Sequence, residues 1–177
     1  MRIISGKNKG KQLIAPVKLP VRPTTDFAKE ALFNILNNYY YFDELSVLDL
    51  FAGTGNISYE FASRGCPSLI AVDSHSGCVQ FISKTARELD YPITVLKADV
   101  YEYLKRTVQR FDVIFADPPY ELPIEKFTEI AELVFERDFL NENGTLIIEH
   151  SSRTDLSNLP HFVTSKKYGG CVLSMFE

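Results

Sequence analysis

Cysteine is scarce in this sequence. The 177 residues include three cysteines, Cys66, Cys78 and Cys171, and no two of them stand in a C-x-x-C spacing. An odd and dispersed set is typical neither of a disulfide framework nor of a zinc site. We therefore expect free thiols packed in a core, and no bound metal.

Long apolar runs are also missing. No stretch approaches the ~20 apolar residues that a membrane-spanning helix needs, and the first ten residues, MRIISGKNKG, lack the apolar core of a signal peptide. Hydrophobic residues make up 45% of the chain and charged residues 24%, which is the balance of an ordinary globular protein. These features predict a cytoplasmic protein with no membrane partner, and the length predicts one domain over residues 1–177.

Acidic residues are absent from the first 22 positions. Six basic residues stand there, whereas the rest of the chain carries 13 basic and 23 acidic side chains and hence a charge of −10. A cationic segment on an acidic body favours contact with a polyanion, most simply nucleic acid, over the alternative of a solvated tail. The candidate RNA-binding residues are Arg2, Lys7, Lys9, Lys11 and Arg22.

The N-terminal part of the chain predicts a hairpin and a helix. Residues 3–14 hold two short apolar pieces around a Gly/Lys/Asn turn, which is typical of a hairpin. Residues 24–40 have helical spacing, with Thr24 or Thr25 as the cap and Asp26 in the first turn. We divide the chain into an N-terminal arm, 1–22, and a core, 23–177.

Strands and helices alternate through the core. Apolar strands are expected at about 46–51, 68–73, 93–99, 111–117 and 144–150, with helices at about 56–64, 75–89, 100–107 and 124–140. Strands that are buried on both faces and alternate with helices predict a parallel sheet between two helical layers. A final hairpin around Tyr168-Gly169-Gly170 is expected to add antiparallel strands to the edge of that sheet.

A Gly-x-Gly turn follows the first strand of the core, in VLDLFAGTGNISYE (47–60). Ligands of open α/β sheets bind beyond the carboxyl ends of the strands, and Gly53 and Gly55 permit a ligand to approach the backbone closely. Asp73 ends the next strand, where an acid can bind the two hydroxyls of a ribose. Asp99 and Asp117 end the following two strands, although either Asp73 or Asp99 alone is also typical of a helix N-cap.

Two classes of nucleotide ligand are compatible with a glycine turn of this kind. A dinucleotide-binding loop needs a third glycine at position 58, where Ser58 stands, and an apolar residue where this chain has Asp49. A carboxylate repels a pyrophosphate but attracts an ammonium group. The sequence therefore favours a nucleoside that carries a cationic amino acid, S-adenosylmethionine, over NAD.

The fourth strand of the core ends in two successive prolines, in FDVIFADPPY (111–120). Proline holds φ at about −65° and keeps the residue before it out of the helical region. The chain therefore leaves the strand as a stiff, extended arm that carries the Asp117 carboxylate and the Tyr120 ring. Taken alone, the segment DPP is also typical of an ordinary turn at the end of a strand.

These segments resemble a known family. VLDLFAGTG is similar to the cofactor loop of S-adenosylmethionine-dependent methyltransferases, and DPPY is similar to the (Asp/Asn/Ser)-Pro-Pro-(Tyr/Phe/Trp) motif of those that methylate exocyclic amino groups. Together with MRIISGKNKGKQL, RPTTDFAKEALFNIL and SRGC, they resemble the RsmD family, which methylates N2 of guanine 966 in bacterial 16S ribosomal RNA. The resemblance implies a Rossmann-like α/β fold with a mostly parallel seven-stranded sheet, an antiparallel C-terminal hairpin and a small basic N-terminal hairpin.

The resemblance also implies roles for single residues. Asp49 and the glycine turn would line the methionine end of the cofactor, Asp73 would hold its ribose and Asp99 would meet its adenine. The segment Arg22-Pro23-Thr24 matches a family motif that closes over the cofactor side. The implied cofactor-binding residues are Asp49, Phe51, Ala52, Gly53, Thr54, Gly55, Asp73, Ser74, Asp99, Val100 and Thr24, and the implied catalytic residues are Asp117, Pro118, Pro119 and Tyr120.

The chemistry of the implied reaction explains the DPPY motif. The amino nitrogen of guanine is a poor nucleophile because its lone pair is delocalised into the ring, and it must aim that lone pair at the methyl group. The Asp117 carboxylate and the Pro118 carbonyl can each accept one N–H, and Tyr120 can stack on the base with its ring alone. Such positioning is worth up to about 7 kcal/mol, Asp117 balances the charge that develops on nitrogen, and no metal is needed.

The expected partner is 16S ribosomal RNA or the small ribosomal subunit, bound by a monomer. Alternatives in the same enzyme class are an adenine-N6 DNA methyltransferase and a glutamine-N5 protein methyltransferase, but a DNA enzyme usually needs a separate target-recognition region, for which the chain has little room. The intact DPPY and glycine loop disfavour a non-catalytic RNA-binding module. Asp49 and Ser58 disfavour a dehydrogenase.

Overall fold

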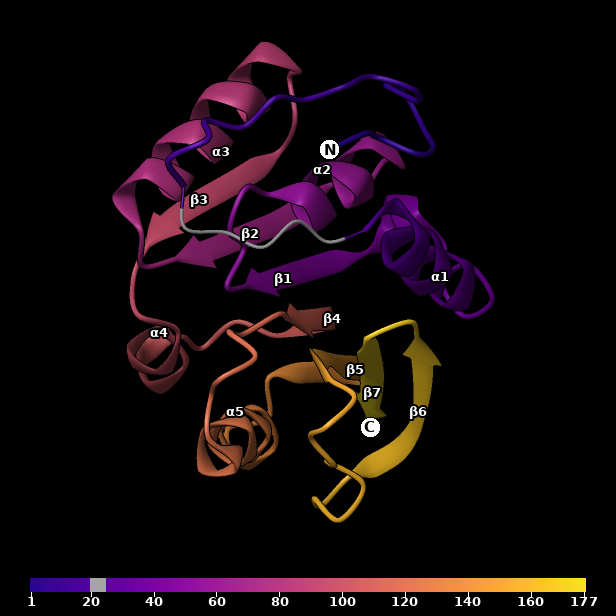
Figure 1. The fold of residues 1–177 in the computed structure, drawn as a ribbon, viewed down its shortest axis with the longest axis vertical. Helices are drawn as coiled ribbons and strands as arrows, with labels where there is room; N and C mark the ends of the chain where they lie inside the picture. The colour runs from indigo at the N-terminus through magenta and orange to yellow at the C-terminus, as the bar shows by residue number, and fades with distance from the viewer. Residues whose placement is uncertain (20–24) are drawn as a thin grey trace.

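A seven-stranded sheet forms the centre of the protein in a computed structural model that describes residues 1–19 and 25–177 (Figure 1). Its strands, in the order β3-β2-β1-β4-β5-β7-β6, are β1 (Ser46–Leu50), β2 (Ser68–Asp73), β3 (Ile93–Lys97), β4 (Phe111–Ala116), β5 (Leu140–Ser151), β6 (Phe162–Tyr168) and β7 (Cys171–Phe176). The first five strands run parallel, and β7 pairs antiparallel with both β5 and β6. This topology confirms the predicted α/β class and the antiparallel C-terminal hairpin.

Helices cover both faces of the sheet (Figure 1). The helices are α1 (Asp26–Leu36), α2 (Asn56–Ser63), α3 (Ser76–Glu88), α4 (Val100–Arg106) and α5 (Ile124–Glu136), with a 3₁₀ turn, η1, at Phe42–Glu44. Side chains from α1, α2 and α3 share one core with alternate strand residues, and those from α4 and α5 share the other. Val47 and Leu48 are both fully buried although they point to opposite faces, as expected for a central parallel strand.

Two helices are shorter than their apolar patterns predict. The helix expected over 124–140 ends at Glu136 because Asp138 takes a left-handed φ of 57°, which breaks the helix and leads into β5. The helix expected over 24–40 spans Asp26–Leu36. Its cap is Thr25, whose hydroxyl accepts a hydrogen bond from the Ala28 N–H at 3.2 Å, and Thr24 lies outside the described residues.

The N-terminal hairpin is docked on α2. Backbone hydrogen bonds join Ile3 to Lys11 and Leu13 to Met1, and the Arg2–Gln12 pair forms one antiparallel bridge rather than a ladder of strands. Ile3 and Leu13 are buried in the core that contains α1 and α2. The basic arm is therefore anchored by apolar side chains on its inner side.

A buried ionic network underlies the same hairpin. The Glu60 carboxylate, which is fully buried, accepts hydrogen bonds from the backbone N–H groups of Ile4 and Ser5 at 2.8 and 3.0 Å. Lys29 lies 3.7 Å from Glu60 and donates to Arg2 O and to Asn56 Oδ1 at 2.5 and 2.8 Å. Burial lowers the pKa of Lys29, and the neighbouring Glu60 opposes that shift.

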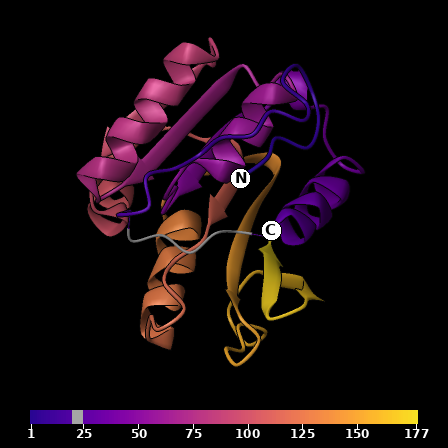
Figure 2. The same ribbon diagram turned by 45° about the horizontal axis from the view of Figure 1, so that its top comes forward.

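Residues 14–19 then cross the outer side of the α2–α3 layer (Figure 2). Leu19 reaches the start of α3, where its side chain lies so close to Gly77 that a Cβ at position 77 would come within 2.8 Å of it. The crossing places the segment over the carboxyl ends of β1 and β2, where the candidate site lies.

The scarcity of cysteine and of long apolar runs has structural counterparts. All three cysteines are buried and free, as expected of core thiols. Within residues 1–19 and 25–177, no helix is long and apolar enough to cross a bilayer. The same residues contain no group of three His, Cys, Asp or Glu side chains placed to hold a metal ion.

Candidate active site

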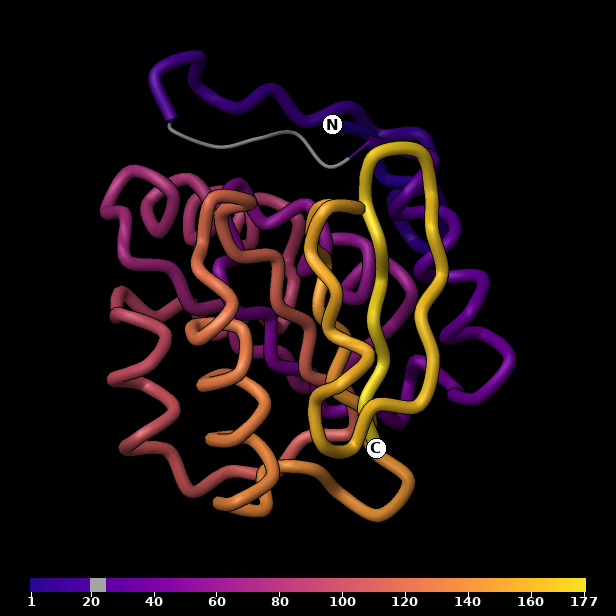
Figure 3. Tube along the Cα trace, turned by 60° about the horizontal axis from the view of Figure 1, so that its bottom comes forward, coloured from indigo at the N-terminus to yellow at the C-terminus, as the bar shows by residue number. Residues whose placement is uncertain are grey.

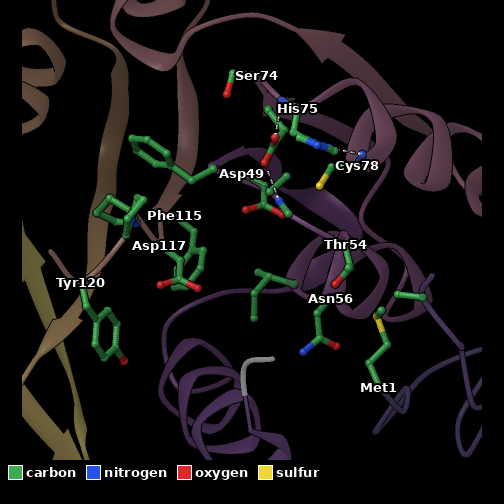
Figure 4. A pocket seen from close by; sticks show the side chains of 18 of the residues that line it. Met1, Asp49, Thr54, Asn56, Ser74, His75, Cys78, Phe115, Asp117 and Tyr120 are labelled. Atoms are coloured by element: carbon green, nitrogen blue, oxygen red, sulfur yellow. Dashed lines mark hydrogen bonds between the residues drawn. The ribbon is translucent and has the colours of Figure 1, made fainter. Parts of the chain in front are cut away.

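A cavity of about 820 Å³ opens at the carboxyl ends of β1, β2 and β4. Its size is that of a small-molecule or cofactor site. Figure 4 shows Asp117 and Tyr120 on one side of it, Thr54, Asn56 and Met1 on the other, and Asp49 between them. The predicted site residues that line it are Asp49, Phe51, Ala52, Gly53, Thr54, Asp73, Ser74, Asp117, Pro118, Pro119 and Tyr120.

The loop after β1 is held in an unusual backbone conformation. Phe51 takes a left-handed φ of 58° and Gly53 one of 55°, and the Ala52 N–H donates to Val72 O at 3.0 Å. A left-handed bulky residue costs about 1–3 kcal/mol and persists where the surrounding structure imposes it, often beside a ligand. The left-handed φ at Phe51, in a loop that lines the cavity, is consistent with the ligand-binding role predicted for this loop from its sequence motif.

Asp49 is a buried carboxylate aimed at the cavity from β1. It is 2% exposed, and Ser58, the residue that stands in place of a third glycine, donates its hydroxyl to Asp49 Oδ2 at 2.5 Å. Burial raises the pKa of Asp49 to about 7, although the hydrogen bond from Ser58 favours the ionised form. A cationic ligand group would relieve that cost, which suits the ammonium group expected from the sequence.

Asp73 is locked in place at the end of β2. Its Oδ2 accepts the Gly53 N–H at 2.8 Å and its Oδ1 accepts the His75 N–H at 2.8 Å. The carboxylate thus ties the β1 loop to the start of α3, and its remaining lone pairs can still accept ribose hydroxyls. His75, which we did not predict for the site, caps α3 and also lines the cavity.

The Asp117–Tyr120 arm leaves β4 directly into the cavity. The Asp117 N–H donates to Leu50 O at 3.3 Å, so the arm begins beside the end of β1. The Pro119 carbonyl accepts the Leu122 N–H at 3.0 Å, which closes a turn before α5. The segment is therefore both a strand-ending turn and a wall of the cavity.

Glu149, which we did not predict from the sequence, contacts the site through Tyr120. It lies on β5 with 6% of its surface exposed, and its Oε1 accepts the Tyr120 hydroxyl at 3.2 Å. The β4–β5 register pairs Ala116 with Ile148, so Glu149 follows at the level of Asp117. An acid near the end of the fifth strand, in the pattern of Asp73 and Asp117, was the signal that could have identified it.

Three predicted cofactor residues do not line the cavity. Gly55 is the N-cap of α2, where a Cβ would lie 2.8 Å from the Tyr59 ring, so packing alone requires glycine there. Asp99 caps α4 and accepts the Glu102 N–H at 3.1 Å, and Val100 is buried beside it. A fourth residue, Thr24, lies outside the described residues. The binding roles of all four stay predictions.

The three predicted RNA-binding lysines lie away from the cavity. Lys7, Lys9 and Lys11 are exposed at the turn of the hairpin, beside Ser63 at the last turn of α2. Asn56, which lines the cavity, starts that helix, so roughly 10 Å of helix separates the two regions. Arg2 lies 3.3 Å from Asp26, and Arg22 is outside the described residues.

Several lining residues come from the docked arm. Met1, Leu13, Ile14 and Ala15 cover the cavity from the side of the N-terminal segment. The sequence does not predict that these residues line the cavity, because their position depends on the docking of the N-terminal hairpin on α2, which is distant in the chain. The cavity thus brings together the buried Asp49, the backbone-fixed Asp73 and the Asp117–Tyr120 arm, which the sequence predicted to act at one site.

Comparison with known proteins gives an independent result. A family model described as conserved hypothetical protein 95 matches residues 1–177. YlbH of Bacillus subtilis (strain 168), provisionally named an rRNA methyltransferase, is 36% identical over 161 residues, which cover 88% of this chain and 85% of YlbH. The ribosomal RNA small subunit methyltransferase D of Buchnera aphidicola subsp. Baizongia pistaciae (strain Bp) is 29% identical over 153 residues, which cover 86% and 76%.

A solved structure shares the fold. The T. thermophilus 16S rRNA N2 G1207 methyltransferase (RsmC), in complex with AdoMet and guanosine, aligns with a TM-score of 0.71 at 20% identity. The alignment covers 90% of this chain and 45% of that one. The fold of this chain is therefore similar to that of a protein that carries both a cofactor and a nucleoside.

Proposed function

This chain belongs to the conserved hypothetical protein 95 family, and from that premise we propose that it is an S-adenosylmethionine-dependent methyltransferase acting on small-subunit ribosomal RNA. The group that it methylates is the exocyclic N2 amino group of a guanine. The observation that carries the proposal is the shared cavity, which the acid-bearing loop of β1 and the Asp117–Tyr120 arm line together.

The residues of the β1–β2 side fit the cofactor. Asp49 is a buried carboxylate whose charge a cation would stabilise, and Asp73 is oriented at both oxygens by backbone N–H groups. Gly53 leaves room for a ligand to approach the backbone of the loop. S-adenosylmethionine, when bound, supplies an electrophilic methyl group on a sulfonium sulfur.

The residues of the β4 side hold the nucleophile. In our proposal the Asp117 carboxylate accepts one N–H of the guanine amino group and the Pro118 carbonyl accepts the other, so that the nitrogen lone pair faces the methyl group. Tyr120 stacks on the extruded base, and Glu149 fixes the ring by accepting its hydroxyl. Asp117 balances the positive charge on nitrogen until the proton leaves, and extrusion of the base costs a few kcal/mol.

Product analysis tests the proposal. The protein is incubated with methyl-labelled cofactor and either naked small-subunit RNA or assembled subunits that lack the modification, and the RNA is digested to nucleosides. We expect label in N2-methylguanosine, and roughly 10²-fold or more slower labelling with Asp117→Ala. Label in N6-methyladenosine, in protein, or in no product with either substrate would refute it.

The same two RNA substrates also show whether the protein acts on naked RNA or on the assembled subunit. The sequence predicts either naked 16S RNA or the small subunit as the partner of a monomer, and those predictions stand as proposals. Comparing initial rates on the two substrates identifies the partner, and sedimentation of the protein alone gives its oligomeric state.

A further inference from the structure

The tip of the C-terminal hairpin reaches the same edge of the sheet as the Asp117 arm. β6 runs parallel to β5 because both pair antiparallel with β7, and Tyr168, at the end of β6, pairs with Cys171, which pairs with Ser151 at the end of β5. In Figure 3 the tip of this yellow hairpin points toward the same end of the view as the N-terminal segment. Tyr168 therefore lies at the edge of the sheet where β5 ends, which is also the edge at which β4 leads into the Asp117 segment.

One row of residues connects the motif to this hairpin. Glu149 pairs with Leu173, and Leu173 pairs with Lys166, all on the face of the sheet that α1 covers. Since Glu149 is level with Asp117, the row runs from the motif across β5 and β7 to Lys166. Three inter-strand spacings of ~4.8 Å place Lys166 about 14 Å from β4.

Aromatic rings lie at the end of this row. Phe27, in the first turn of α1, is 64% exposed, and its ring meets that of Tyr168 edge to face with centroids 5.9 Å apart. Phe27 contributes little to the core because most of its surface stays in water, whereas Tyr168 is half-buried and packs against the core. The exposed Phe27 ring, supported at its edge by the half-buried Tyr168 ring, offers the kind of aromatic surface on which unstacked bases stack.

Positive charge accompanies the rings. Lys166 and Lys167 are both exposed, and neither forms an ion pair with any residue in the described part of the chain. Many other surface cations are neutralised, as Lys84 is by Glu88 and Lys105 by Glu129. Lys166 lies on the face of β6 that carries Tyr168, whereas Lys167 points to the other face of this edge strand. The two ammonium groups therefore flank the edge strand next to the rings, where each can contact a phosphate.

We propose that Phe27, Tyr168, Lys166 and Lys167 form an RNA-docking surface that holds the nucleotides flanking the extruded guanine. The rings stack on a neighbouring base and the ammonium groups contact its phosphates. This inference rests on the proposed function and adds a second, sequence-tolerant contact to it. It also differs from the sequence-based prediction, because Lys7, Lys9 and Lys11 lie at the far end of α2 from the cavity.

Equilibrium RNA binding tests the surface, with a helix-loop fragment of small-subunit RNA containing the target guanine as the probe. For Lys166→Ala/Lys167→Ala, the slope of log affinity against log salt should decrease by about 1.4, since each phosphate contact on a single strand contributes about 0.7. For Phe27→Ala and Tyr168→Ala, affinity should fall about fivefold or more with the slope unchanged. Tyr168→Phe, which keeps the ring, should bind as the wild type does.

A matched control removes the same charge elsewhere. Lys84→Ala/Arg87→Ala deletes two exposed cations from the last turns of α3 and should leave the slope as it is. If every variant of the RNA-docking surface keeps the wild-type RNA affinity and salt slope, while the wild type still transfers methyl groups, the proposed surface is refuted. The proposed function would then still stand. Failure of the wild type to methylate any RNA would instead refute the proposed function.

Discussion

The two sides of the cavity hold their acids by different means. On the β1–β2 side, Asp49 is buried and Asp73 is fixed by two backbone N–H groups within a strained loop. On the β4–β5 side, Asp117 stands on a proline arm and Tyr120 is anchored by a side chain, Glu149. In the proposed function the β1–β2 side holds the cofactor and the β4–β5 side holds the target base, so substitutions on the two sides should affect different steps.

Asp117→Ala is the strongest test of this division. It removes an acceptor of the amino N–H and the counter-charge for the developing cation, so the single-turnover rate of methyl transfer should fall by roughly 10²-fold or more. Cofactor affinity, measured by calorimetry with the demethylated product, should stay within about twofold of the wild type. Full activity would mean that the arm is only a turn.

Asp49→Asn should give the opposite pattern. Loss of a buried carboxylate that meets an ammonium group costs about 2 kcal/mol or more, which corresponds to at least a thirtyfold weaker cofactor affinity. RNA affinity should be unchanged. If calorimetry gives wild-type cofactor affinity, Asp49 does not meet the cation.

The same variant has a predicted effect on stability. The pKa of Asp49 is raised to about 7 in the folded protein by burial, so between about pH 4 and 7 the folded state binds a proton that the unfolded state has lost. Asp49 therefore lowers the free energy of unfolding as pH rises through that range. Asp49→Asn should remove this decline and stabilise the cofactor-free protein at pH 8 by on the order of 2–4 kcal/mol, measured by urea unfolding.

Tyr120→Phe measures the side-chain anchor. If Tyr120 only stacks on the base, the phenyl ring is sufficient, and this substitution should leave kcat/KM for RNA unchanged. The hydrogen bond to Glu149 gives a different expectation, namely a loss of about threefold to tenfold in kcat/KM for RNA, the value of one buried hydrogen bond. Glu149→Gln, which keeps an acceptor, should be milder, and cofactor affinity should not change in either variant.

Ser58→Ala should have the smallest effect, on the cofactor side. Without the hydroxyl that donates to Asp49, the pKa of this carboxyl should rise further, so that less of it is ionised at pH 7. Cofactor affinity should fall about threefold at pH 7 and recover at pH 9, where Asp49 is ionised in both proteins. A loss that persists at pH 9 would assign Ser58 a purely structural role.

Local chemistry alone was enough to predict much of the site. The carboxyl end of a parallel strand is where its following loop must lie, so the sequence pattern was sufficient to group Asp49, Gly53 and Asp73. The two prolines likewise dictated an extended arm after β4. Alternation of apolar strands with helices predicted the topology, because only a covered parallel sheet buries strands on both faces.

Other parts of the site depend on contacts between distant segments. The N-terminal arm docks on the protein through Glu60 and Lys29. This docking places Lys7, Lys9 and Lys11 at the far end of α2 and brings Met1 and Leu13 over the cavity. The distribution of charged residues located the basic segment in the sequence. It could not predict how this segment is oriented on the protein, because the buried Glu60–Lys29 network and the side chains of Ile3 and Leu13 determine that orientation.

The sequence by itself determined the order of strands and helices, the binding loop and the carboxylate–proline arm, since each follows from backbone preferences and from residues close together in the chain. Only the tertiary structure decided that Glu149 accepts the Tyr120 hydroxyl, that Ser58 supports Asp49, and that the Phe27 ring meets the Tyr168 ring at the end of β6. Those pairs join different elements, and their geometry is set by sheet register and by packing across the core, which no local pattern encodes.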